Sequence, residues 1–296
     1  MILRGLFGLI FSICLTQDTF SIVAVNPFTG EVGSAGASCI AGSIIISDVH
    51  PSVGAIHTQS YWIAGNQNLG NEYMNQGYSP EQIIDSLLAN DVQNNSAVRQ
   101  YGVVDLIDGA RSAAFTGENC YDYKGHLASS TYSIQGNILL GEEILTQMEY
   151  NFLNTQGNFS QKLMSALQGA NVSGADTRCE QYGTSSLSAF IRLAYPNDNT
   201  DELFLDLNIN NVTPGIEPID ILQNQFDTWQ TTQPEIILGD VNIDSFINIT
   251  DILLIVTNIT SNYSLSIQAL YSADINIDSI LNIQDIIIII NIILGN

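Results

Sequence analysis

Two kinds of hydrophobic pattern alternate along most of the chain. Runs rich in β-branched and apolar residues, bounded by turns such as residues 26–30, are typical of β-strands. Later segments place apolar residues three and four positions apart, which is typical of amphipathic helices. The predicted strands cover residues 20–25, 32–38, 43–47, 53–60, 100–107, 111–116, 132–139, 186–195 and 203–209, with a loop around His126.

One helix has a clear start in the sequence. Ser79 is a suitable N-cap, Pro80 fits the first turn, and Gln82 can close a capping box. Further helices are predicted over residues 142–153, 159–167 and 219–229. Strands come first, helices follow, and strands return, which predicts an α+β domain of sheets layered with helices.

The composition changes after residue 230. A short polar segment with Pro234 leads into residues 235–296, which hold seven acidic residues and no Lys or Arg. We therefore predict a first domain over residues 19–230, a linker over residues 231–237 and a second domain over residues 238–296.

The second domain carries a duplicated loop motif whose copies lie 34 residues apart. Each copy has oxygen-bearing side chains at loop positions 1, 3, 5, 9 and 12, and position 7 can offer a backbone carbonyl. Such a loop can enclose a hard cation, so the sequence predicts two calcium ions. Asx-rich turns stabilised by their own side chains are the alternative. The predicted ligands are Asp240, Asn242, Asp244, Phe246, Asn248 and Asp251 in the first loop, and Asp274, Asn276, Asp278, Ile280, Asn282 and Asp285 in the second.

Each loop runs into a single apolar helix, and this tandem resembles a type I dockerin over residues 238–296. The resemblance implies a small all-α domain with calcium-dependent folding. It also implies attachment to a cohesin-like protein or cell-surface scaffold. The chain departs from the family at position 6, where Ser245 and Ser279 replace the usual Gly. The pair after position 9, Ile249–Thr250 and Ile283–Gln284, also differs from the usual Ser-Thr type.

The N-terminus has the pattern of a secretion signal. A short basic start precedes the apolar run at residues 6–15, so residues 1–16 are predicted to be a signal peptide of a secreted protein. A buried N-terminal element and a lipid anchor are the alternatives. Neither this run nor residues 286–290 is long enough for a membrane span. The net charge of -23 argues against binding to nucleic acid.

Three cysteines follow the predicted signal, Cys39, Cys120 and Cys179. In an exported protein two of them could form a disulfide, and the sequence leaves the pairing open.

Residues 19 to about 230 resemble the DUF1028 family of uncharacterised function, which has been placed among the N-terminal-nucleophile (Ntn) hydrolases. The resemblance implies a four-layer αββα fold. The matching segments are residues 19–24, 29–33, 57–59, 99–105, 114–117, 125–126, 132–139 and 174–178.

The resemblance also implies a chemistry. An N-terminal Thr, Ser or Cys attacks a carbonyl, and its own α-amine serves as the base. Thr19 is the expected nucleophile, Asn137 could hold an oxyanion, and Asp176 and Arg178 could orient the amine or a substrate carboxylate.

This chemistry requires cleavage immediately before Thr19, whereas signal cleavage after Thr16 leaves two residues in front of it. Two functions follow. The first is a secreted amide-bond hydrolase tethered by its calcium-binding module. The alternative is a non-catalytic extracellular binding or structural protein on the same scaffold.

Overall fold

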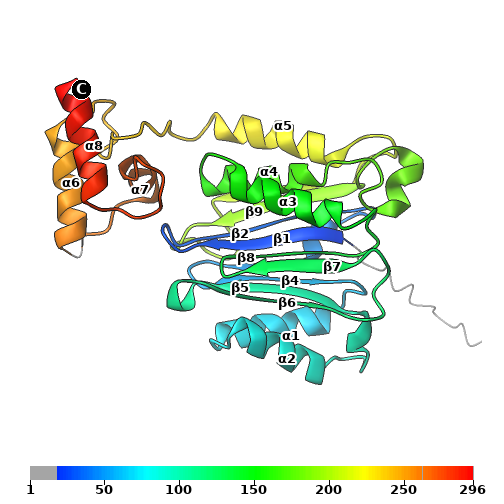
Figure 1. Cartoon of the computed structure of the whole chain (residues 1–296). Coiled ribbons are helices and arrows are strands. Elements are labelled where there is room, and N and C mark those ends of the chain that lie inside the picture. The colour runs from blue at the N-terminus through cyan, green and yellow to red at the C-terminus, as the bar shows by residue number, and fades with distance from the viewer. Residues whose placement is uncertain (1–18, 262, 296) are drawn as a thin grey trace, which may run out of the picture.

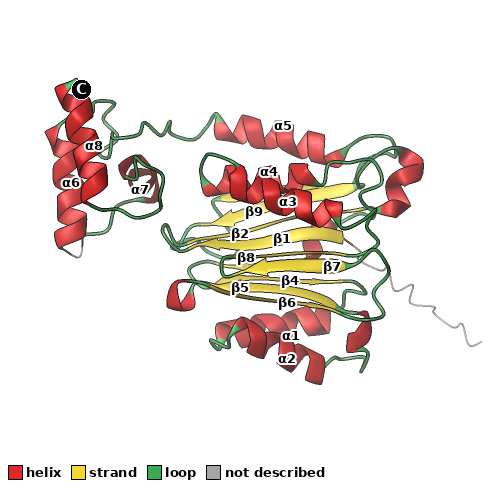
Figure 2. Ribbon diagram, in the orientation of Figure 1, coloured by secondary structure: helices red, strands yellow, loops and turns green. Residues whose placement is uncertain are grey.

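The computed structural model describes residues 19–261 and 263–295, so the predicted signal peptide lies outside the described residues. Its larger part contains two antiparallel sheets (Figures 1 and 2). The six-stranded sheet has the order β10-β9-β2-β1-β8-β7, and the four-stranded sheet the order β3-β4-β5-β6. The strands are β1 (Thr19–Asn26), β2 (Glu31–Ser38), β3 (Ser47–His50), β4 (Gly54–Gln59), β5 (Gln100–Asp105), β6 (Arg111–Thr116), β7 (Gly125–Ser129), β8 (Tyr132–Gly136), β9 (Ser188–Ala194) and β10 (Leu205–Ile209).

Helices cover the outer face of each sheet (Figure 1). The helices α3 (Glu143–Asn154), α4 (Phe159–Gly169) and α5 (Pro218–Gln230) share a hydrophobic core with the six-stranded sheet. The helices α1 (Ala64–Asn75) and α2 (Pro80–Ala89) pack on the four-stranded sheet. The two sheets lie face to face between these helical layers, which confirms the expected α+β class.

Strand β1 is buried on both faces, and its alternating side chains serve two different neighbours. Phe20 and Ile22 belong to the core beneath the helices. Val23 and Val25 pack between the two sheets with residues of β3, β4 and β5. Thr19 therefore lies on the side of β1 that faces the second sheet.

Several sequence predictions for local structure are confirmed. Helix α2 begins as expected, because the Ser79 hydroxyl accepts from the Gln82 amide at 3.3 Å and the Gln82 side chain accepts from the Ser79 amide at 2.9 Å. The predicted helices after residues 142, 159 and 219 correspond to α3, α4 and α5.

Other predictions for local structure were wrong. The strand expected at residues 43–47 is mostly a 3-10 helix, Ser43–Ile46, in which only Ser43 and Ile46 are buried. The loop expected around His126 is strand β7, which pairs with β8 along its whole length. Helix α1 had no counterpart in the sequence analysis.

The C-terminal module contains the helices α6 (Ile249–Thr260), α7 (Ile267–Ala273) and α8 (Ile283–Leu294) around a small core of its own. Helix α7 was not predicted. The module lies at the end of the sheets opposite to the start of β1 (Figure 1). Among the helices of residues 19–295 that are described, none has the length and apolar character to cross a membrane.

Candidate functional site

Thr19 is the first residue of β1 and is fully buried. Its neighbour across the β1–β2 pair is Ser38, the last residue of β2. The ends of β4 and β8 lie at the same place, because β8 pairs with β1 and β4 packs against it from the second sheet. The sheet ends therefore bring residues from four strands around Thr19.

Asn137 holds the backbone of Thr19 from both sides. The Thr19 amide nitrogen donates to Oδ1 of Asn137 at 3.3 Å, and the Asn137 amide donates to the Thr19 carbonyl at 3.1 Å. Nδ2 of Asn137 donates to the Ser60 hydroxyl at 3.0 Å. The Thr19 carbonyl also accepts from the side chain of Gln59 at 3.2 Å. The side-chain oxygen of Asn137 thus faces the atom that a cleavage before Thr19 would turn into an α-amine.

The backbone amide and carbonyl of Thr19 are hydrogen-bonded, whereas its side-chain oxygen is not bonded to any described residue. Oγ1 is buried, and it has no hydrogen-bond partner among the described residues. A buried hydroxyl without a partner costs about 1 to 3 kcal/mol, so folded proteins keep few of them. The hydroxyl expected to act as nucleophile is therefore not used to hold the fold together.

Strained backbone surrounds Thr19. Ser60 and Tyr61, which follow β4, have φ angles of 55° and 51°, and Ile138, which follows β8, has a φ of 55°. L-residues avoid this left-handed region, and a β-branched residue such as Ile avoids it most strongly. Strain of this kind gathers at functional sites, where the surrounding structure maintains it.

Asp176 and Arg178 form an ion pair next to the end of β2. The guanidinium of Arg178 donates to both carboxylate oxygens of Asp176, at 2.9 and 2.6 Å. Asp176 also accepts from the amide of Cys39 at 3.0 Å, and Arg178 reaches the Ser38 hydroxyl at 3.5 Å. The pair therefore supports Ser38, which lies across from Thr19, and Cys39, which follows β2.

A disulfide between Cys39 and Cys179 joins the end of β2 to the segment that carries Asp176 and Arg178. The cysteine pairing that the sequence left open is therefore Cys39 with Cys179. Cys120 is outside this bond and buried, and its sulfur donates to the carbonyl of Arg99 at 3.3 Å. The disulfide and the Asp176–Arg178 pair together fix the segment after β2 against the 3-10 helix Thr177–Tyr182.

A buried polar network continues from Thr19 into the space between the sheets, and the sequence analysis did not foresee it. Ser21 donates to Gln59 at 2.6 Å and accepts from Gln135 at 2.7 Å. Gln59 in turn donates to Gln100 at 2.8 Å. The signal in the sequence was Thr19 and Ser21 on the inner face of a strand that is otherwise apolar.

His57 belongs to this network and is fully buried. Its ring nitrogens lie 2.9 Å from the Ser21 hydroxyl and 2.6 Å from that of Ser34. Burial lowers the pKa of His57 to about 3, and Arg192 adds to this shift, so the ring is neutral near pH 7. A neutral imidazole with a hydroxyl on each nitrogen helps to hold β1, β2 and β4 together.

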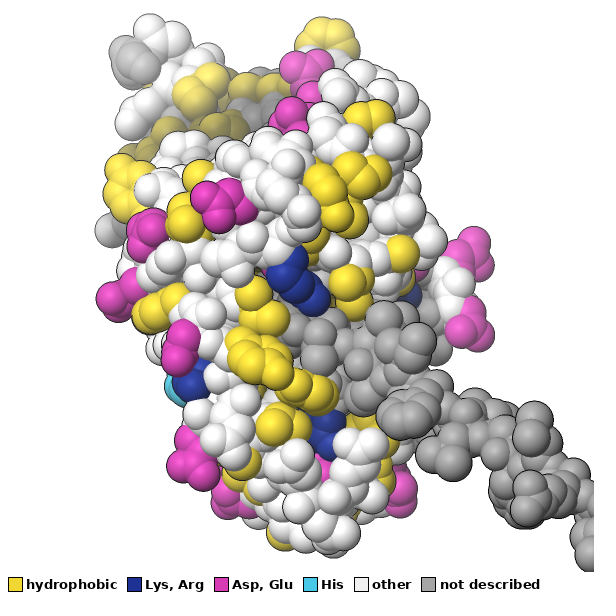
Figure 3. Space-filling model, turned by 90° about the vertical axis from the view of Figure 1, so that its right-hand side faces the viewer, with side chains coloured by type: hydrophobic (Ala, Val, Ile, Leu, Met, Phe, Trp, Pro, Cys, Tyr) yellow, Lys and Arg dark blue, Asp and Glu magenta, His cyan; other side chains and the backbone are white. Residues whose placement is uncertain are grey.

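Figure 3 shows the molecular face at the end of the sheets where β1 begins. Lys and Arg side chains lie near the middle of this face beside hydrophobic side chains, while Asp and Glu lie mostly toward its edges. The chain as a whole carries a net charge of -23, so this local arrangement is unlike its average composition.

The two C-terminal loops have the same geometry. In the first, Asp240 accepts from the amides of Asp244 and Ser245 at 3.0 and 2.8 Å. In the second, Asp274 accepts from the corresponding amides at 3.0 and 2.8 Å. The Ser residues at position 6 have φ angles of 69° and 61°, as the replacement of Gly requires. The sequence repeat is therefore a structural repeat.

The oxygen-bearing side chains of each loop are of the types that bind calcium in proteins. Asp251 and Asp285, at position 12, are fully buried at the start of α6 and α8 and accept from amides of their own loops. The side chains at positions 3 and 5 bond to each other in both loops, because Nδ2 of Asn242 donates to Asp244 and Nδ2 of Asn276 donates to Asp278, each at 2.8 Å. Within the described residues, no cluster of three or more His, Cys, Asp or Glu is placed to hold a metal.

Comparisons with known proteins concern the larger domain. The family of unknown function DUF1028 matches residues 19–219. The chain is similar to the crystal structure of a protein from Silicibacter pomeroyi that is assigned to the same family. The two share 25% identity with a TM-score of 0.59, over 71% of this chain and 88% of the other. No curated protein matches the chain. The family match begins at Thr19 and ends before the C-terminal loops.

Proposed function

This chain belongs to the family of unknown function DUF1028, and we propose that it is a secreted Ntn-type hydrolase of amide bonds, tethered through a calcium-binding, dockerin-like module. The observation that carries the proposal is the environment of Thr19. Its hydroxyl is buried without a described partner, and its nitrogen lies 3.3 Å from Oδ1 of Asn137. The layers of helix, sheet, sheet and helix support the αββα assignment.

The chemistry begins with cleavage of the bond between Asp18 and Thr19. The new α-amine takes the proton of the Thr19 hydroxyl, and Oγ1 attacks the carbonyl carbon of the substrate amide. The amine then gives a proton to the departing nitrogen, which leaves an ester on Thr19 for water to hydrolyse. An α-amine titrates near pH 8, so it can accept a proton near neutral pH. His57 does not compete as a base, because burial lowers its pKa to about 3 and the hydroxyls of Ser21 and Ser34 occupy both ring nitrogens.

The contacts refine the roles expected of the other three residues. Oδ1 of Asn137 faces the Thr19 nitrogen, so we assign Asn137 to positioning the amine before any role at an oxyanion. Asp176 and Arg178 brace Ser38 and Cys39, which places them in support of the β2 end.

The two repeated loops support the proposal that the C-terminal module binds calcium and tethers the chain. Their donors are hard oxygens, which suit calcium, and bound calcium would neutralise the three Asp carboxylates of each loop. Calorimetry on the full chain should show two ions bound. Asp240→Ala and Asp274→Ala should each remove one ion, and Asp220→Ala, on an exposed part of α5, should remove none. Stoichiometry unchanged in both loop variants would refute the calcium sites.

The two loops and the helices after them also expose an apolar surface that can contact a partner protein. Apolar side chains are exposed at equivalent positions of the two repeats, which include Phe246 at 71% and Ile280 at 60% exposure. Exposed apolar patches of this kind mark protein contacts. A cohesin-like protein on a cell-surface scaffold is the partner that the dockerin-like arrangement favours. The residues of this surface are Phe246, Ile249, Leu253, Ile280, Ile283 and Ile287.

The decisive experiment for catalysis is to determine the N-terminus of the mature exported protein. Thr19 as first residue, together with a mass adduct on Thr19 from an acylating probe, supports the hydrolase. Gln17 as first residue, with no adduct, favours the alternative of a non-catalytic binding or structural protein. An adduct on Cys120 instead would show that a different residue is the nucleophile.

A further inference from the structure

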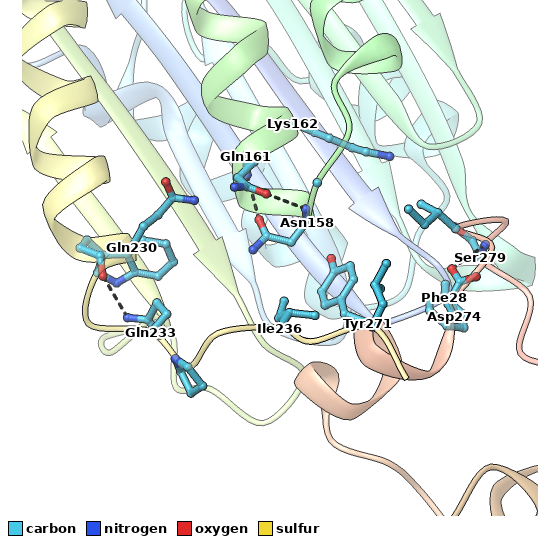
Figure 4. A pocket seen from close by; sticks show the side chains of 15 residues that line it. Phe28, Asn158, Gln161, Lys162, Gln230, Gln233, Ile236, Tyr271, Asp274 and Ser279 are labelled. Carbon is cyan, nitrogen blue, oxygen red and sulfur yellow. Dashed lines mark hydrogen bonds between the residues drawn. The ribbon is translucent and has the colours of Figure 1, made fainter. Parts of the chain in front are cut away.

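A cavity of about 410 Å³ lies between the larger domain and the C-terminal module (Figure 4). It is bordered by the start of α4, the end of α5, the linker, α7 and the second calcium loop. A neighbouring cavity of about 390 Å³ shares Phe28, Lys162 and Ser279 with it. Each volume is in the range of small-molecule binding sites.

This cavity is separate from the site around Thr19. Thr19 and Asn26 are the two ends of β1, which has eight residues. At about 3.3 Å per residue they lie roughly 23 Å apart. Phe28, in the turn beyond Asn26, lines the cavity. A ligand here would therefore not touch the proposed nucleophile.

Hydrogen bonds between the two domains fix the cavity walls. The amide of Phe159, at the start of α4, donates to the hydroxyl of Tyr271 in α7 at 3.0 Å. Asn26 also donates to this hydroxyl, at 3.3 Å. Tyr271 lies at the centre of the view in Figure 4, below Asn158 and Gln161. The hydrogen bonds of Tyr271 therefore hold the two domains in the arrangement that forms the cavity.

The lining combines aromatic rings with amides that have unused hydrogen-bonding groups. Phe28, Trp229 and Tyr271 contribute the rings. Asn158 and Gln161 bond to each other through their side-chain oxygens and backbone amides, which leaves their NH2 groups without a described partner. Gln230 makes no side-chain hydrogen bond to any described residue. Rings beside several amide groups are suited to a ligand with an apolar face and many hydroxyls.

Lys162 supplies a positive charge. Five of the six Lys and Arg residues in the described part of the chain form ion pairs with Asp side chains, whereas Lys162 has no such partner there. The paired residues are Arg99, Arg111, Lys124, Arg178 and Arg192. An unpaired cation in a chain of net charge -23 favours an anionic ligand.

One carboxylate also lines the cavity, that of Asp274. Both of its oxygens accept backbone amides of the second loop, from Asp278 at 3.0 Å and Ser279 at 2.8 Å. Asp274 is therefore bonded within its own loop and forms no ion pair with Lys162, so the Lys162 ammonium remains available to a ligand.

We propose that this interdomain cavity binds an acidic monosaccharide of the hexuronate class. The aromatic rings cover the C–H face of the sugar, the amides of Asn158 and Gln230 bond its hydroxyls, and Lys162 pairs with its carboxylate. This site is additional to the proposed hydrolase site and does not depend on Thr19.

The full chain can report binding by its own fluorescence. Trp62 and Trp229 are the two tryptophans of the sequence, and Trp229 lines the cavity. In a Trp62→Phe background, glucuronate added at saturating calcium should change the Trp229 emission in a saturable way. Glucose, which lacks the carboxylate, should bind at least about tenfold more weakly than glucuronate. Acetate, which lacks the ring, should bind more weakly still.

Lys162→Met keeps most of the side-chain stem and removes the charge, so it should weaken glucuronate binding about tenfold or more while leaving glucose unaffected. Lys124→Met is the matched control, because Lys124 is paired with Asp122 and does not line the cavity. Equal binding of glucuronate by the Lys162 and Lys124 variants would overturn the proposal. Acetate binding as tightly as glucuronate, or an emission change that never saturates, would overturn it as well.

Discussion

The hydroxyl of Tyr271 in the C-terminal module donates to Oε2 of Glu31, a carboxylate buried in the larger domain. The same oxygen accepts from Thr29 at 2.5 Å and from Asn26 at 3.3 Å. Burial raises the pKa of Glu31, and it raises that of Tyr271 as well. Tyr271 lies three residues before Asp274, the first position of the second C-terminal loop. The module is therefore joined to the larger domain directly beside one of its proposed ion sites.

Tyr271→Phe should loosen this junction. The variant removes the donor to a buried carboxylate and the acceptor of the Phe159 amide, which should cost about 1 to 3 kcal/mol of interdomain free energy. We expect hydrogen exchange at the Phe159 amide to become about tenfold faster or more, because 1.4 kcal/mol corresponds to a factor of ten. Tyr263→Phe, at an exposed tyrosine of the same module, is the control. Equal protection of Phe159 in both variants would contradict the assignment.

Glu31 predicts a dependence of stability on pH. Its folded pKa is raised above the usual value of 4.5 by burial, so between these two values the folded chain holds a proton that the unfolded chain has released. The resulting stabilisation is complete below about pH 4.5 and is lost as pH rises through the folded pKa.

Urea unfolding across this pH range should test the sign. In Glu31→Gln the decline of stability attributable to Glu31 should disappear, because Gln does not titrate. Glu235→Gln, in the exposed linker, should keep the slope of the natural chain. A Glu31→Gln slope identical to that of the natural chain would show that Glu31 does not control it.

The Cys39–Cys179 disulfide should contribute strongly to stability. It closes a segment of 140 residues, and removing a long-range disulfide costs about 2 to 5 kcal/mol. The double variant Cys39→Ser/Cys179→Ser should therefore unfold at a lower denaturant concentration. Cys120→Ser keeps the disulfide and replaces a buried sulfur with an oxygen of similar bonding capacity, so it should lose much less. The prediction fails if the two changes prove equally destabilising.

The sequence predicted elements well where a local signal was strong. The capping box at Ser79 placed the start of α2, and the repeat placed both C-terminal loops and the helices after them. Helix α1 was missed because Ala64–Asn75 has two glycines and a largely polar composition, and the residues it buries include Asn66 and Gln67. Its burial depends on the sheet beneath it, which local sequence does not reveal.

The candidate site was predicted in part for the same reason. Thr19 and Asn137 were named from a family resemblance, and they lie in contact. Ser60, whose hydroxyl holds Nδ2 of Asn137, was missed because nothing in its local sequence distinguishes it from other strand ends. The polar network around Ser21 arises from strands far apart in the chain, so it becomes visible only when the sheets are stacked.

The variants of Thr19 test the catalytic proposal most directly. Thr19→Ala should abolish turnover and probe labelling, because the nucleophilic oxygen is gone. It should change stability by no more than about 1 kcal/mol, because the lost oxygen makes no hydrogen bond to a described residue while the lost γ-methyl is buried. Thr19→Ser keeps the hydroxyl and the amine and should retain measurable activity.

Asn137→Ala completes this series, because it separates an orienting role from the chemistry itself. Loss of the 3.3 Å contact should lower kcat without removing the labelling of Thr19, since the nucleophile stays in place. If the free amine is the base, kcat/KM should rise with pH through the titration of that amine, near pH 8, in both the unsubstituted chain and Thr19→Ser. A rate that follows instead a group titrating near pH 6 would assign the base to another residue. Full activity in Thr19→Ala would reject Thr19 as the nucleophile.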